Sequence, residues 1–164
     1  SEGGALVCHP QEVYIEQVFQ TIFEVLGAVA QKKNIILHND VSPDLVCYVD
    51  INMITSVLQN LCSNAIKFTR NGGHVYLSAI QAGSDVHIKV RDTGIGMTES
   101  QIQGFFNSQQ PQSIKGTDGE KGTGLGLLLC RQFVEKNNGK MQIESTLDQG
   151  TTFTITVPSG LIAS

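Results

Sequence analysis

The chain has 164 residues, of which 40% are hydrophobic and 16% charged, and its formal net charge is −4. This composition is typical of one globular domain, large enough to bury roughly two thirds of its unfolded surface, and it excludes a disordered or fibrous chain. The acidic balance, without a block of Lys or Arg, argues against a surface that neutralises many nucleic-acid phosphates. Any phosphate recognition is therefore expected to be local.

No apolar run approaches the roughly 20 residues that cross a bilayer, so we expect a soluble domain without direct membrane contact. The cysteines stand far apart and predict small buried hydrophobes in a reducing compartment rather than a zinc site. The histidines are interpreted as isolated structural or exposed residues: His9, His38, His74 and His87.

Spacings of three and four between apolar residues predict an amphipathic helix from Glu12 to about Lys32. Two β-branched runs follow, at 34–38 and 45–49, and the turn residues between them predict a hairpin. Asp50 is the expected N-cap of a second helix, which ends near Thr69.

The rest of the chain mixes hairpins and helices. Alternating runs at 74–80 and 85–91 predict a second hairpin. The elements expected after it are a short helix over 98–106, a long polar loop over 107–121, a helix over 125–136, and strands over 140–145 and 151–157. Because strands and helices do not strictly alternate, the order favours an α+β sandwich over a doubly wound sheet.

Asn60, Asn64 and Lys67 lie at i, i+4 and i+7, which places them on one polar stripe of the second helix. A solvated helix face is one interpretation of this stripe. The other is that amide oxygens there coordinate a hard cation such as Mg²⁺, whose remaining ligands are water and substrate phosphates. Lys67 would then contact a phosphate oxygen.

Asp92 continues the parity of the buried positions along its predicted strand, so its carboxylate is expected on the buried face. It either caps the turn that follows, or accepts a hydrogen bond from an exocyclic amine of a ligand. In the second case Gly94 and Gly96 would let the backbone approach that ligand closely.

A glycine-rich turn over 122–127 leads directly into a predicted helix, where free backbone N–H groups favour anions. A merely flexible linker is the weaker interpretation, because the glycines alternate with Thr and Leu. The spacing is not GxGxxG, and the chain contains no P-loop, GxSxG or HExxH motif. These absences argue against a dinucleotide fold, a P-loop enzyme and the common hydrolase sites.

Three segments, in order and spacing, resemble the N, G1 and G2 boxes of the catalytic and ATP-binding domain of sensor histidine kinases: LQNLCSNAIKFT at 58–69, RDTGIGM at 91–97 and GTGLGL at 122–127. Segments 139–145 and 150–153 resemble the last conserved part of that domain. The resemblance implies the Bergerat fold, a two-layer α/β sandwich in which about three helices cover one face of a mixed, mostly antiparallel sheet. It divides the chain into a flexible end at 1–11, the domain at 12–158 with an ATP lid at 107–121, and a tail at 159–164.

The resemblance also implies ATP and Mg²⁺ as cofactors. Asn64 would be the metal ligand with Asn60 beside it, Lys67 a phosphate contact and Phe68 a wall of the nucleotide pocket. Asp92 would accept from the adenine amino group, and Thr151 would join the water network at adenine. Residues that would shape the pocket and bind phosphates are Gly94, Gly96, Gly122, Thr123, Gly124, Leu125, Gly126 and Leu127.

The chain departs from the family pattern in two places. Phe105 and Phe106 are adjacent, whereas the family has two phenylalanines about three residues apart. The phosphoacceptor box, a histidine followed by an acidic residue, is absent, since His9 precedes Pro10. No catalytic residue is therefore assigned, and the target histidine is expected on a preceding dimerisation segment.

The resemblance implies a protein-histidine kinase domain in two-component signal transduction. Its partners would be the phosphoacceptor helices of the same parent protein and, indirectly, a response regulator, with no nucleic acid involved. A cytoplasmic location is implied, in a family whose parent proteins are often membrane-bound. Two alternatives stay open: an ATP-binding regulatory or docking module without transfer activity, and an ATPase like gyrase or Hsp90. Those ATPases place a Glu where Asn60 stands, which favours transfer over hydrolysis here.

Overall fold

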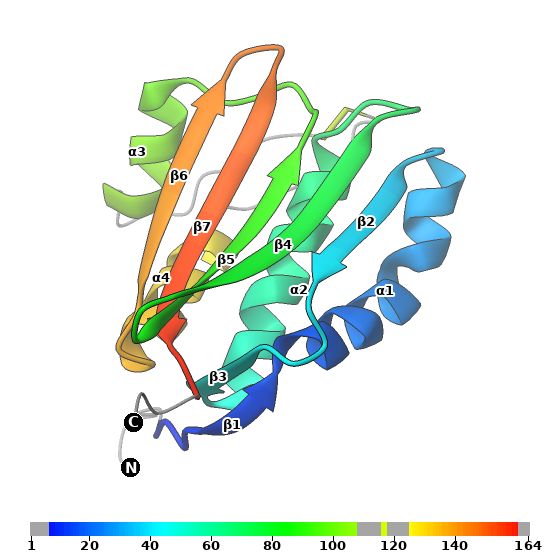
Figure 1. Ribbon diagram of the computed structural model, residues 1–164. Helices are drawn as coiled ribbons and strands as arrows, with labels where there is room; N and C mark the ends of the chain where they lie inside the picture. The colour runs from blue at the N-terminus through cyan, green and yellow to red at the C-terminus, as the bar shows by residue number, and fades with distance from the viewer. Residues whose placement is uncertain (1–6, 108–115, 118–124, 161–164) are drawn as a thin grey trace.

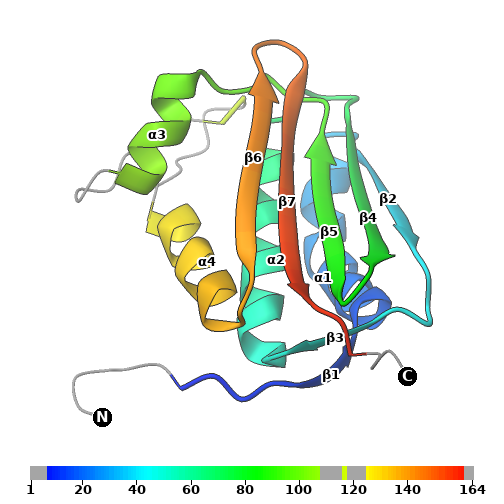
Figure 2. The same ribbon diagram turned by 60° about the vertical axis from the view of Figure 1, so that its left-hand side comes forward.

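The computed structural model describes residues 7–107, 116–117 and 125–160. These residues form two layers, with a mixed sheet whose one face is covered by helices (Figure 1). The α+β sandwich predicted from the element order is confirmed. Helices α1 and α2 lie behind the strands in Figure 2, whereas α4 and α3 are seen toward the β6 edge, where α4 packs against α2 and β6.

The elements in chain order are β1 (Gln11–Tyr14), α1 (Ile15–Lys32), β2 (Ile36–Val41), β3 (Val46–Val49), α2 (Ile51–Lys67), β4 (His74–Ala82), β5 (Asp85–Asp92), α3 (Glu99–Asn107), α4 (Leu125–Lys136), β6 (Lys140–Thr146) and β7 (Gly150–Pro158). No helix among the described residues is long and apolar enough to span a membrane.

The main sheet has the order β2-β4-β5-β7-β6, with β2 parallel to β4 and the other neighbours antiparallel. The predicted second hairpin is confirmed as β4–β5. Residues Val75 and Leu77 of β4 face the helices and are fully buried, whereas Tyr76 between them points to the other face. The outer face of β4 therefore carries His74, Tyr76, Ser78 and Ile80.

The predicted first hairpin is wrong. Both β-branched runs are strands, but β2 pairs in parallel with β4, and β3 leaves the main sheet to pair with β1. The turn that separates them is closed by a hydrogen bond from Leu45 N to Ser42 O, and it directs the chain away from β2. Local turn residues mark where a strand ends without specifying its partner.

The first helix begins at Ile15 rather than at Glu12. Residues 11–14 are extended, with Val13 buried between exposed neighbours and paired with Cys47. Four residues are too few to distinguish the alternation of a strand from the helical spacing that follows. The sequence pattern therefore extended the predicted helix over β1.

Asp50 is the N-cap of helix α2, as predicted, and its Oδ1 accepts from the backbone N–H groups of Asn52 and Met53 at 2.9 and 3.0 Å. Burial of Asp50 opposes ionisation, but hydrogen bonds from the His9, Met53 and Asn52 backbone outweigh that cost and lower its pKa. Leu58 and Leu61 of this helix are fully buried in the core.

Asn137, directly after α4, joins several segments at the end of the molecule where α2 begins. Its Oδ1 accepts from Asp50 N at 2.7 Å and from Cys8 Sγ at 3.3 Å, and its Nδ2 donates to Phe133 O at 2.8 Å. His9 N in turn donates to Asp50 Oδ2 at 2.9 Å. The start of α2, the end of α4 and the segment ahead of β1 are thus held together by one buried amide and one carboxylate.

The cysteines are free thiols, and Cys47, Cys62 and Cys130 are buried as predicted, while Cys8 is half-buried. Burial raises the pKa of Cys47 and Cys62 to about 12, so these thiols stay protonated and behave as apolar side chains.

Candidate functional site

The polar stripe of α2 faces the beginning of α4. Asn64 and Lys67 are half-buried and Asn60 is exposed. The Oδ1 atom of Asn60 lies 3.8 Å from the position that a Cβ at Gly126 would take. Burial raises the pKa of the Cys130 thiol on α4 to about 12, and a hydrogen bond with Asn60 opposes that shift. The structure therefore brings two of the sequence-predicted segments together, the stripe and the helix that follows the glycine-rich turn.

Asp92 ends β5 with its carboxylate buried, at 5% residual exposure. Oδ1 accepts hydrogen bonds from Gly94 N at 2.8 Å and Thr151 N at 3.2 Å. Burial raises the pKa of Asp92 to about 6, with those two bonds and the Arg91 charge acting in the opposite direction. The bond to Gly94 shows that the carboxylate does cap its own turn, and it does so through one oxygen.

The loop that follows Asp92 lies directly against the end of α2. Ile95 N donates to Phe68 O at 3.0 Å, and a Cβ at Gly94 would overlap that same carbonyl oxygen. Gly96 has φ +71°, and a Cβ there would overlap the carbonyl oxygen of Thr146. Side chains are excluded at both glycines, because the backbone needs this close approach.

The β6–β7 connection closes the other side of this loop. Ser145 Oγ accepts from Met97 N at 2.7 Å and lies 2.7 Å from Thr151 Oγ1, and Asp148 N donates to Ile95 O at 2.8 Å. A cavity of about 190 Å³ is lined in part by Asp92, Ser145 and Thr151. Ser145 was not among the predicted site residues, although it stands in the closing segment that resembles the family.

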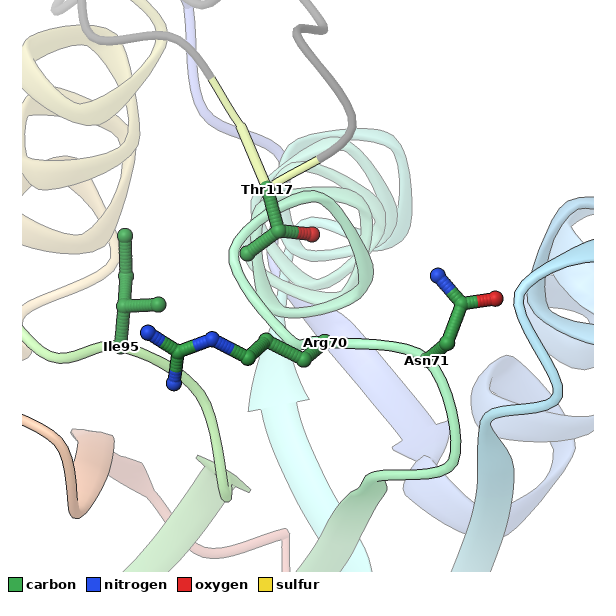
Figure 3. A pocket seen from close by; sticks show the side chains of 4 residues that line it. All are labelled: Arg70, Asn71, Ile95 and Thr117. Atoms are coloured by element: carbon green, nitrogen blue, oxygen red, sulfur yellow. The ribbon is translucent and has the colours of Figure 1, made fainter.

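A second cavity, of about 420 Å³, lies at the end of α2 and is lined by Arg70, Asn71, Ile95 and Thr117. Figure 3 shows the Arg70 side chain extending toward Ile95, with Thr117 on the opposite wall. Thr117 N donates to Lys67 O at 3.0 Å and its Oγ1 donates to Thr69 O at 3.0 Å. Thr117, from the predicted lid, is therefore held against the end of α2.

Lys33 is a contributor that the sequence pattern missed. Its side chain is buried, at 5% exposure, and Nζ donates to Ile66 O at 3.0 Å, Lys67 O at 3.1 Å and Thr117 Oγ1 at 2.7 Å. The ammonium group satisfies carbonyls of the last turn of α2 and complements the negative end of the helix dipole. A lysine at a helix end is ordinarily solvated, so no local signal distinguished it from Lys32.

Several predicted residues are described only in part or not at all. Gly122, Thr123 and Gly124 lie outside the described residues, as does most of the predicted lid at 107–121. Leu125 opens α4, and Leu127 packs in the core. Phe106 lies under the Arg131 guanidinium, 4.9 Å from its ring centroid, which fixes α3 against α4.

Residues 49–161 match the family described as histidine kinase-, DNA gyrase B-, and HSP90-like ATPase. The chain belongs to this family. It is 34% identical over 164 residues to the adaptive-response sensory kinase SasA of Crocosphaera subtropica, a match that covers 96% of the chain and 41% of SasA. The chain therefore spans about two fifths of the length of this relative.

Solved structures agree on the fold. The catalytic domain of the histidine kinase ThkA superposes with a TM-score of 0.78 at 24% identity, covering 92% of the chain and 95% of that domain. Full-length ShkA in complex with AMPPNP superposes with the same TM-score at 27% identity, covering 98% of the chain and 33% of ShkA. The sheet and helices described above are those of an ATP-binding domain of the histidine kinase type.

Proposed function

We propose that the space bounded by the α2 stripe, the loop after Asp92 and the start of α4 binds ATP with Mg²⁺. We further propose that the protein containing this domain transfers the γ-phosphate of that ATP to a histidine. The proposal rests chiefly on Asp92, whose buried carboxylate is held by Gly94 and Thr151 through Oδ1. Oδ2 is then the oxygen that would accept from the adenine amino group, while Gly94 and Gly96 keep side chains away from the base.

The phosphates would lie toward Asn64 and Lys67. The donor set fits the proposed ligand: the Asn64 amide oxygen is of the kind that Mg²⁺ prefers, and the Lys67 ammonium is one turn further along the same helix. Mg²⁺, when bound, would neutralise phosphate charge. Lys67 would orient a phosphate oxygen, Phe68 would border the nucleotide, and Asn60 would face the glycine-rich turn through Gly126.

The remaining predicted residues complete this pocket. The turn that includes Gly122, Thr123, Gly124 and Leu125 would offer backbone N–H groups to the phosphates ahead of α4. Thr151 would contribute its hydroxyl, shared with Ser145, to water at adenine. Leu127 would act by anchoring the first turn of α4 in the core.

Transfer is favoured over hydrolysis by the chemistry of Asn60. An amide cannot take a proton from an attacking water, whereas a carboxylate at this position could act as a general base. The acceptor histidine would lie on phosphoacceptor helices of the parent protein, with a response regulator as the later recipient. We place the ATP-binding domain at 12–158, its lid at 107–121, and the whole in the cytoplasm.

An isosteric substitution tests the site assignment. Asp92→Asn keeps an oxygen for Gly94 and Thr151 but turns the second atom into a donor, which would face the adenine amino group. Titration calorimetry with a non-hydrolysable ATP analogue and Mg²⁺ should show at least about a hundredfold weaker binding. The reason is that the variant loses a charge-assisted hydrogen bond and sets two donors against each other. Unchanged affinity would place the nucleotide elsewhere.

Transfer is tested separately, with γ-labelled ATP and a separately supplied phosphoacceptor helical segment from the parent protein. Acid-labile label on a histidine of that segment is the expected result. Binding of the analogue without any transfer would support the regulatory alternative instead. Steady phosphate release, at the same rate with and without the segment, would support the ATPase alternative.

A further inference from the structure

Two histidines that the sequence pattern treats as isolated meet on the outer face of the sheet. His38 on β2 and His74 on β4 point to the face opposite the helices, because Tyr76, which is opposite His38 in the register, alternates with the buried Val75 and Leu77. His38 Nε2 and His74 Nδ1 are 3.0 Å apart, and both side chains are half-buried. The expectation of isolated histidines is wrong for this pair.

The rings are held in place by stacking. The His38 ring lies parallel to the Tyr76 ring, with centroids 4.4 Å apart and planes 9° apart, and the His74 ring is 5.2 Å from that of His38. The Arg91 guanidinium covers Tyr76 at 4.1 Å from the ring centroid. Both imidazoles stand on neighbouring strands of a hydrogen-bonded sheet, so their nitrogens are pre-positioned.

The distance between the two nitrogens can be compared with the spacing of two ligands on one metal ion. Imidazole nitrogens bind a first-row divalent ion at about 2.0–2.1 Å. Two such nitrogens are about 2.9 Å apart at a 90° angle and about 3.3–3.4 Å apart at a tetrahedral angle. The 3.0 Å between the nitrogens, which here is the length of their hydrogen bond, is closest to the spacing of adjacent positions in a square-planar or tetragonal centre, the geometry of Cu²⁺ and Ni²⁺ with nitrogen and oxygen ligands.

We propose that His38 and His74 form a two-histidine binding site for Cu²⁺ or Ni²⁺ on the outer face of the sheet. One ring donates the hydrogen bond between them, so on binding it transfers that proton through solvent to its other nitrogen. Both facing nitrogens then offer lone pairs, with no net change in protons. The described residues contain no group of three or more His, Cys, Asp and Glu that would hold a metal, so water completes the coordination.

This site is separate from the proposed Mg²⁺ position. His38 and His74 lie on the face of the sheet opposite the helices, and the ligands are nitrogens rather than the amide oxygen of Asn64 on α2. His74 is nevertheless joined to the loop after Asp92 through its backbone, since His74 N donates to Thr93 Oγ1 at 3.0 Å and Thr93 N donates to His74 O at 3.1 Å. Because the two sites have no ligand in common, metal binding can be assayed without nucleotide.

The test is a Cu²⁺ titration of the whole chain without nucleotide, followed by calorimetry and electron paramagnetic resonance. The wild-type spectrum should show two equatorial nitrogens. His38→Gln and His74→Gln should each weaken binding about tenfold or more, because each leaves a single ligand in place of a chelating pair. His87→Gln, a half-buried histidine on the outer face of β5, is the matched control and should bind like the wild type.

A measurement on the wild-type chain guards against misfolded variants. In histidine ring spectra, substoichiometric Cu²⁺ should broaden the His38 and His74 signals before those of His9 and His87. Earlier broadening of His9 or His87, a single equatorial nitrogen, or wild-type affinity in both single variants would each overturn the proposal.

Discussion

Ile95 N donates a hydrogen bond to Phe68 O at 3.0 Å, which joins the loop after β5 to the C-cap residue of α2. The two segments are otherwise 27 positions apart in sequence. Phe68 borders the proposed nucleotide pocket, and the loop carries the glycines next to Asp92. This backbone contact therefore sets the spacing between the two walls of the pocket.

Gly94→Ala should disrupt that spacing. The added Cβ would overlap Phe68 O, a backbone atom that cannot rotate away, so the loop must shift. We expect destabilisation of about 1–3 kcal/mol in chemical denaturation, together with weaker binding of the ATP analogue. Gly27→Ala is the control, because a Cβ at Gly27 meets no atom within 4 Å, and it should leave binding unchanged.

Asp92→Asn should change the pH dependence of stability. Folding raises the pKa of Asp92 from 3.8 to about 6, so between those values the folded domain holds a proton that the unfolded chain releases. The unfolding free energy due to this group therefore falls as pH rises through that window, and the penalty, on the order of 2–3 kcal/mol, is complete above about pH 6.

Relative to the wild type, Asp92→Asn should thus gain stability as pH rises from about 4 to about 7, while losing nucleotide affinity. Urea denaturation at several pH values measures the first effect. Equal pH slopes in the two proteins would show that the carboxylate is not desolvated as the structure indicates. Opposite signs for stability and binding would separate a ligand-binding role from a structural one.

Asn64→Ala should remove the Mg²⁺ dependence of nucleotide binding. Wild-type affinity for the ATP analogue should rise when Mg²⁺ is added, whereas the variant should bind about equally with and without it, because the amide oxygen on α2 is lost. Asn52→Ala, on the exposed first turn of the same helix, serves as the control. A full Mg²⁺ effect in Asn64→Ala would assign the ion to other ligands.

Lys33→Met should destabilise the domain by about 2–4 kcal/mol in chemical denaturation. The substitution keeps most of the side-chain length but removes the buried ammonium that donates to the Ile66 and Lys67 carbonyls and to Thr117 Oγ1. Lys32→Met, at an exposed neighbouring position, should change stability by less than about 0.5 kcal/mol. Similar effects of both substitutions would contradict the capping role of Lys33.

The parts of the fold that the sequence predicted are those controlled by local patterns. The start of α2 followed from the short polar side chain of Asp50 ahead of an apolar helical spacing, and β4–β5 followed from alternation around Gly83 and Ser84. The parallel pairing of β2 with β4 was missed, because strand partners are chosen by the sheet as a whole. Residues 36–41 carry no local signal that distinguishes a hairpin strand from a parallel edge strand.

The site divides in the same way. Helical spacing and strand parity place some candidate residues on defined faces, so their positions could be predicted from the sequence: Asn60, Asn64, Lys67 and Asp92. The contacts of Lys33, and the pairing of His38 with His74, could not be predicted in this way, because they join elements that are distant in sequence. Burial of a lysine or proximity of two histidines becomes visible only once β2, β4 and the end of α2 are placed in space.

The amide of Asn137 has a mechanical consequence. Helices α2 and α4 run in opposite directions, joined at one end by Asn137 and facing each other through Asn60 and Gly126 at the other. Because residues 8 and 9 are bonded to Asn137 and Asp50, the segment ahead of β1 is tied to both helices at this one end. A load on that segment would therefore act on α2 and α4 together, at the end of the pair opposite to Asn60 and Gly126.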